Sequence, residues 1–101
     1  MKQSKIVIGI LRFTLHAPDS ESLKARRQVT AGLLARLRRR FPAAVAEVGE
    51  MDLWQKMEVA AAVVSTDGRH AEGVMAGMIE FLEKNAAETV LSDVSTELVR
   101  V

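Results

Sequence analysis

Two stretches with a helical spacing of apolar residues constrain the fold of this chain most strongly. In the first, apolar residues recur at three- and four-residue steps, which predicts one buried stripe: Leu23, Val29, Leu33, Leu34, Leu37 and Phe41. The opposite side is predicted to face solvent: Lys24, Gln28, Ala31, Ala35, Arg38 and Arg39. Ser22 is a good N-cap and Pro42 cannot continue a helix, so we expect the helix to lie between them.

The second helical stripe is preceded by Ser65, Thr66 and Asp67, which offer another N-cap, and it stops near Asn85. Its apolar members are Ala71, Val74, Met75, Met78 and Leu82. The remaining apolar segments have strand-like patterns, over residues 6–16, 44–48, 59–64 and 89–101. The polar stretch between the second and third of these predicts a hairpin.

The resulting order is strand, helix, strand, strand, helix, strand, which predicts one α+β domain over residues 1–101. This is the ferredoxin-like split βαβ arrangement (βαββαβ), with two helices on one face of a four-stranded antiparallel sheet. Right-handed crossovers then bring the turn after the first strand, the start of the first helix and the hairpin loop to one end of the sheet.

Composition narrows the class of protein further. The 101 residues include no cysteine, so disulfides and cysteine-ligated metals are excluded and a reducing cytoplasm is expected. The longest apolar runs are far below the roughly 18–20 residues that span a bilayer, so we expect no membrane segment. The amino-terminal residues lack a cleavage site of small residues and are interpreted as mature sequence.

Three stretches together resemble the YlxP-like family of small bacterial proteins, a family of unknown function. They are Ser22-Leu23-Lys24-Ala25-Arg26-Arg27, then Val45 to Gly49 running on to Asp52-Leu53-Trp54-Gln55, then Ser65-Thr66-Asp67 with Arg69-His70. The sequence departs from the family at Pro42, where Asn is frequent, and at Arg26, where Lys is usual. The resemblance implies a ferredoxin-like domain and, since such genes often lie among translation and ribosome-maturation genes, association with RNA or the ribosome.

Charge is strongly separated although the net charge is only +1. Residues 24–40 hold seven cations and no acid, namely Lys24, Arg26, Arg27, Arg36, Arg38, Arg39 and Arg40. The last four sit at the end of the helix, where its dipole favours cations and stability alone explains them. The first three sit in the first turn, where the dipole disfavours them, so they are predicted to pair either with acids or with an external anion.

Both explanations of the first-turn cations stay open. The hairpin brings Glu47, Glu50 and Asp52 to the same end, where they would form surface ion pairs. Alternatively, the free backbone N–H groups, the Ser22 hydroxyl and the cations form a phosphate site. Trp54, at the same end, either covers the core or offers a flat surface to a base.

A row of isoleucines on the first strand gives a second candidate surface. If Phe13 and Leu15 face the helices, then Ile6, Ile8 and Ile10 face away from them. Large exposed apolar patches usually mark interfaces, so this row predicts a homodimer, unless long side chains or the termini cover it.

The residues favour a non-enzymatic protein. His16 and His70 do not form a zinc-binding spacing, no glycine-rich phosphate loop occurs, and we predict no catalytic residues, no cofactor and no metal site. We therefore expect a cytoplasmic accessory protein that binds RNA or the ribosome. The predicted site is Ser22, Lys24, Arg26, Arg27, Arg36, Arg38, Arg39, Arg40 and Trp54. The alternative is a homodimeric or small-anion-binding domain.

Overall fold

The computed structural model describes residues 5–16, 23–49, 56–85 and 89–101, without the side chains of Leu23 and Arg26. Its elements follow the predicted order. They are β1 (Val7–His16), α1 (Leu23–Arg40), β2 (Ala44–Glu47), β3 (Lys56–Ser65), α2 (Gly68–Asn85) and β4 (Val90–Arg100).

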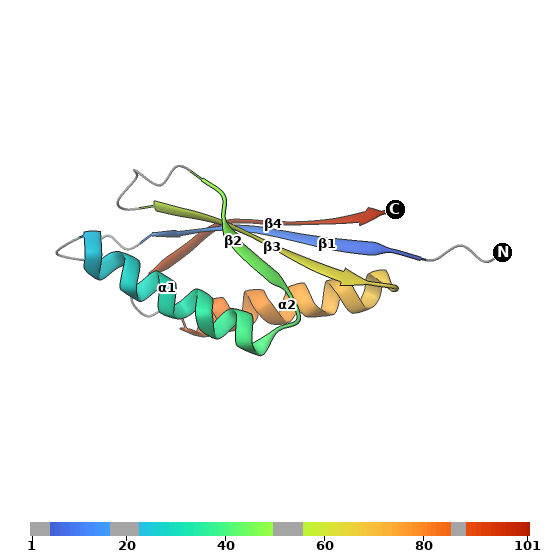
Figure 1. The fold of residues 1–101 in the computed structure, drawn as a ribbon, viewed down its shortest axis with the longest axis horizontal. Helices are drawn as coiled ribbons and strands as arrows, with labels where there is room; N and C mark the ends of the chain where they lie inside the picture. Colours follow the sequence, from blue (N-terminus) through green and yellow to red (C-terminus); the bar gives the residue numbers. More distant parts are fainter. Residues whose placement is uncertain (1–4, 17–22, 50–55, 86–88) are drawn as a thin grey trace.

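The four strands form one antiparallel sheet in the order β2-β3-β1-β4, and both helices cover the same face of it (Figure 1). The ferredoxin-like split βαβ fold predicted from the sequence is therefore confirmed. The residue before β1 pairs with the residue after β4, since the backbone N–H of Val101 donates to the carbonyl of Ile6 over 3.0 Å. The start of α1 and the ends of β1 and of α2 lie towards the opposite end of the sheet.

Strand boundaries differ modestly from the prediction, and pairing explains the differences. β1 begins at Val7 and not at Ile6, and β2 ends at Glu47 and not at Val48. β3 begins at Lys56 instead of Val59 because its first residues pair with the last residues of β1. Glu58, for example, pairs with Thr14. Cross-strand pairing here outweighs the low strand propensity of charged residues.

The helix ends follow the predicted signals. Asp67 is the N-cap of α2, because its Oδ1 accepts a hydrogen bond from the backbone N–H of Arg69 over 2.9 Å. Ser65 Oγ accepts the N–H of Asp67 over 3.1 Å and supports this turn. α1 ends at Arg40, shortly before Pro42.

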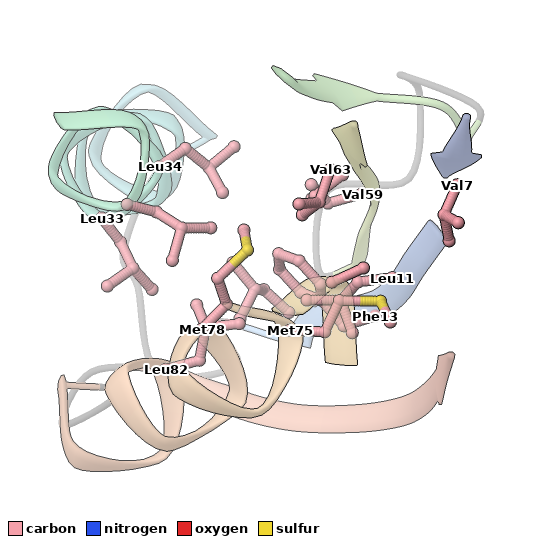
Figure 2. Close-up of a cluster of buried hydrophobic side chains, with 14 residues drawn as sticks. Val7, Leu11, Phe13, Leu33, Leu34, Val59, Val63, Met75, Met78 and Leu82 are labelled. Carbon is pink, nitrogen blue, oxygen red and sulfur yellow. The ribbon is translucent and has the colours of Figure 1, made fainter. Parts of the chain in front are cut away.

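The core lies between the sheet and the helices (Figure 2). Side chains from β1 and β3 meet those of the helices there, and the residues with the least exposure include Leu11, Phe13, Leu15, Leu33, Leu37, Val59, Val63, Met78 and Leu82. The two predicted helical stripes are confirmed at Leu33, Leu34 and Leu37 and at Ala71, Met75, Met78 and Leu82. Val29, Phe41 and Val74 are only half-buried, since they lie at the margins of these stripes.

One irregularity interrupts the sheet. The register between β1 and β4 shifts between Arg12 and Thr14, as in a β-bulge. Asp93 lies in this stretch with a positive φ of 53°, in the left-handed region that Asp tolerates better than most residues. None of the described helices is both long and apolar enough to cross a membrane.

Candidate nucleic-acid interface

Helix α1 presents most of its described cations to solvent. Lys24, Arg36 and Arg39 are exposed, as are Arg38 and Arg40, whereas Arg27 is half-buried. No acidic residue occurs between positions 23 and 40, so no carboxylate of the helix itself offsets these charges. The helix thus forms a basic outer surface, which we call the α1 basic surface and define by Lys24, Arg36, Arg38, Arg39 and Arg40.

Two cations in the last turn of α1 also bind within the protein. Arg38 donates from Nε and Nη2 to the carbonyl oxygen of Val45, over 3.3 and 3.0 Å. The guanidinium carbon of Arg40 lies 5.7 Å from the ring centroid of Phe81, within the range of a cation–π contact. These contacts join α1 to β2 and to α2, and they agree with the interpretation that the last-turn cations contribute to stability.

The first turn of α1 is described only in part. Ser22 and Trp54 lie outside the described residues, and so does the side chain of Arg26. The proposed partners Glu50 and Asp52 also lie outside them, whereas Glu47 is exposed at the end of β2. The choice between internal ion pairs and an external phosphate therefore stays a prediction.

Two ion pairs join described residues elsewhere in the fold. Lys56 Nζ lies 3.5 Å from Glu58 Oε1 on β3, and Lys84 Nζ lies 2.7 Å from Glu80 Oε1 on α2. The pKa of the Glu80 carboxyl is lowered because Lys84 donates a hydrogen bond to it and adds an attractive charge. Neither pair includes a residue of the α1 basic surface.

The face of the sheet away from the helices carries the predicted isoleucine row. Ile8 and Ile10 are half-buried there, while Ile6 is 41% exposed. Val64 of β3 stands opposite Ile8 and is 71% exposed, and Val99 of β4 stands opposite Ile8 on the other side. The apolar row is therefore wider than the first strand alone indicates.

Sequence reasoning missed a row of hydrogen-bonded polar side chains at the other end of this face, where β1 pairs with β4. His16 Nε2 lies 2.9 Å from Ser92 Oγ, and Ser92 Oγ donates to Asp93 Oδ2 over 3.1 Å. The contact joins β4 to β1, and the His16 tautomer sets which of the two groups donates in it.

No local motif could have predicted this contact, since His16 and Ser92 are 76 positions apart in the sequence. Within the part of the chain that the structure describes, no three side chains of His, Cys, Asp or Glu come together in a way that could hold a metal ion.

Comparison with known proteins identifies a family. Residues 8–95 match the family described as "Protein of unknown function (DUF503)". The uncharacterized protein YlxP of Bacillus subtilis (strain 168) is 29% identical over 65 residues, covering 64% of this chain and 71% of its own length.

Solved structures agree on the fold. A protein of unknown function from Nitrosomonas europaea, NE2512, is similar with a TM-score of 0.54 and 15% identity, covering 93% of this chain and 89% of its own. The de novo designed protein Foldit4 is similar with a TM-score of 0.50 and 15% identity, covering 92% of this chain and 96% of its own. Because the family match spans most of the sequence and the structure has the expected fold, the chain belongs to the DUF503 family, and the YlxP protein of Bacillus subtilis is one of its relatives.

Proposed function

We propose that this protein is a non-enzymatic, cytoplasmic accessory protein that associates with RNA or the ribosome through α1. The observation that supports the proposal is a helix with seven cations and no acid, on a chain whose 13 aspartates and glutamates all lie outside that helix. Lys24, Arg36 and Arg39 point into solvent and can reach phosphate oxygens.

The contact is to the nucleic-acid backbone and not to bases. Domains of this topology that read bases use aromatic side chains on the two central strands of the sheet. Here β1 and β3 contain one such aromatic, Phe13, and it is buried on the helix side. Binding through α1 alone is electrostatic, so its affinity falls steeply as salt rises.

The test is co-sedimentation with ribosomes of the chain carrying Lys24→Gln and Arg39→Gln, at low and at moderate salt. Both residues are exposed and neither makes a contact described above, so the fold is expected to persist. Removal of two phosphate contacts is expected to reduce the slope of log affinity against log salt by about 1.4–1.8 and to weaken binding about tenfold at low salt.

A matched control is the double variant Arg69→Gln and Arg100→Gln, which removes two exposed cations outside α1 and is expected to leave binding unchanged. Equal co-sedimentation of the α1 variant and the unmodified chain at both salt concentrations would remove the proposal. Loss of binding by the control as strongly as by the α1 variant would do the same, because binding would then follow net charge and not the helix.

The open face of the sheet favours a second candidate, a homodimer. Ile8, Ile10, Val64 and Val99 share this face with small alanines of β2 and β3, so two copies can approach closely. Arg12 and Glu97 lie on the same face, on neighbouring strands. A two-fold contact between like faces lets the arginine of each copy meet the glutamate of the other.

Val64→Lys tests this candidate without disturbing the core, because Val64 is 71% exposed. If the face forms a dimer, light scattering after gel filtration is expected to give the mass of two chains for the unmodified protein and of one chain for Val64→Lys. Val94→Lys is the control, because Val94 is also exposed but lies on the opposite face of the sheet. This placement follows from Thr96, two residues further along β4, which pairs with the buried Leu11. A single-chain mass for the unmodified protein rules out the dimer.

A further inference from the structure

Arg38 of α1 is held in place by the edge of the sheet. The N–H of Val48 donates to the carbonyl of Glu58, so alternate residues of β2 direct their backbone groups towards β3, and Val45 directs its own away from it. β2 is an edge strand, and the outward carbonyl of Val45 accepts hydrogen bonds from Nε and Nη2 of Arg38. Arg38 therefore satisfies a backbone group on the free side of this strand.

The contact with Val45 uses one edge of the Arg38 guanidinium. Arginine has five N–H donors, and two of them, on Nε and Nη2, are directed to the carbonyl. One N–H of Nη2 and one of Nη1 form the outer end of the fork, where a phosphate can accept two parallel hydrogen bonds. Arg38 is exposed and joins neither ion pair between described residues, so no described carboxylate takes this end of the fork.

Arg40 is held by its face and not by an edge. Its guanidinium carbon lies over the Phe81 ring, 5.7 Å from the centroid. The Phe81 ring meets the Phe41 ring edge-on, with a centroid distance of 5.9 Å and an interplanar angle of 74°. The N–H groups of a guanidinium lie in its own plane, so a contact through the face leaves all five of them as donors.

The acids nearest in the fold do not neutralise these two arginines. Glu80 lines the same hollow as Arg40 and Phe81, but its carboxylate accepts from Lys84 Nζ at 2.7 Å. Glu47 is exposed at the end of β2, and no ion pair joins it to Arg38. Both guanidinium groups thus keep their charge available to a group from outside.

The two held arginines lie on opposite sides of the last turn of α1. Successive residues of a helix are rotated by about 100°, so Arg38 and Arg40 are about 200° apart, with Arg39 between them. Their contacts place Arg38 on the β2 side and Arg40 on the α2 side. The helix dipole adds roughly half a negative charge at this end, which the three arginines outweigh.

We propose that Arg38 and Arg40 fix the position of an RNA backbone that crosses the last turn of α1 from the β2 side to the α2 side. Each arginine gives one phosphate two parallel hydrogen bonds. Because contacts within the protein already restrict both side chains, less conformational entropy is lost on binding. Lys24, Arg36 and Arg39, which make none of the described contacts, add attraction without fixing geometry. This inference rests on the proposed binding of RNA through α1.

The test replaces arginine by lysine, which keeps the charge and removes the fork. The full chain with Arg38→Lys and Arg40→Lys is compared, by co-sedimentation with ribosomes at low and at moderate salt, with a control carrying Arg36→Lys and Arg39→Lys. The first variant is expected to bind about tenfold more weakly, because each phosphate loses one of two charged hydrogen bonds. Its slope of log affinity against log salt is expected to stay unchanged, because the number of cations is the same. The control is expected to bind like the unmodified chain.

Equal affinity of the two lysine variants overturns the inference. If the chain with Lys24→Gln and Arg39→Gln binds more weakly while the two lysine variants bind alike, α1 binds RNA by charge alone and only this inference fails. If that chain binds like the unmodified protein, the proposed function and the inference fail together.

Urea denaturation separates binding from a structural role of the two arginines. Loss of the contacts with Val45 and Phe81 is expected to lower the urea midpoint of the first variant slightly, so binding is compared where circular dichroism shows all variants to be folded. A lower midpoint with unchanged ribosome affinity assigns Arg38 and Arg40 to stability alone and overturns the inference. The single variants Arg38→Lys and Arg40→Lys are expected to show intermediate affinities.

Discussion

Replacement of Phe13 by alanine is expected to lower the free energy of unfolding by about 3–5 kcal/mol. Phe13 is 2% exposed, and it lies on β1, which is the strand between β3 and β4 in the sheet, with its side chain in the core shared with the helices. Truncation removes apolar surface from the core and leaves a cavity that the antiparallel neighbours cannot close. Since domains are stable by only about 5–15 kcal/mol in total, much of the stability is lost.

Urea denaturation followed by circular dichroism measures this loss. Val64→Ala is the control on the neighbouring strand, because Val64 is 71% exposed and its truncation is expected to change stability by less than about 0.5 kcal/mol. A loss of similar size in the two variants would contradict the assignment of the core to the helix side of the sheet.

The helices could be predicted closely because their signals are local. Asp67 caps α2 through its own side chain, and Pro42 stops α1 through its missing N–H group. The buried stripes follow from apolar spacing alone. The start of β3 could not be predicted in this way, because Lys56 and Glu58 join the sheet through pairing with β1, which no local pattern records.

The sequence predicts which residues of the candidate site carry positive charge, but it does not predict how their side chains are arranged. The excess of cations on α1 is visible in the sequence, but the contact of Arg38 with the Val45 carbonyl depends on where β2 packs.

Gly9 shows what an isolated glycine means in this fold. By sequence it indicates only that no glycine-rich phosphate loop is present. In the structure a Cβ at Gly9 would lie 3.0 Å from both Sδ and Cε of Met75 and 3.4 Å from Cβ of Ala71. Its φ is not positive, so the glycine is required for the close approach of α2 to β1 and not for an unusual backbone conformation.

Gly9→Val is therefore expected to destabilise the protein by about 1–3 kcal/mol through overpacking against α2. Met75→Ala alone is expected to cost about 2–5 kcal/mol because it leaves a cavity at the same place. The two together are expected to cost less than the sum, with a coupling of about 0.5–3 kcal/mol, since the valine occupies space that the methionine vacates. Urea denaturation of the four proteins of this cycle measures the coupling, and strictly additive losses would show that Gly9 and Met75 do not compete for one space.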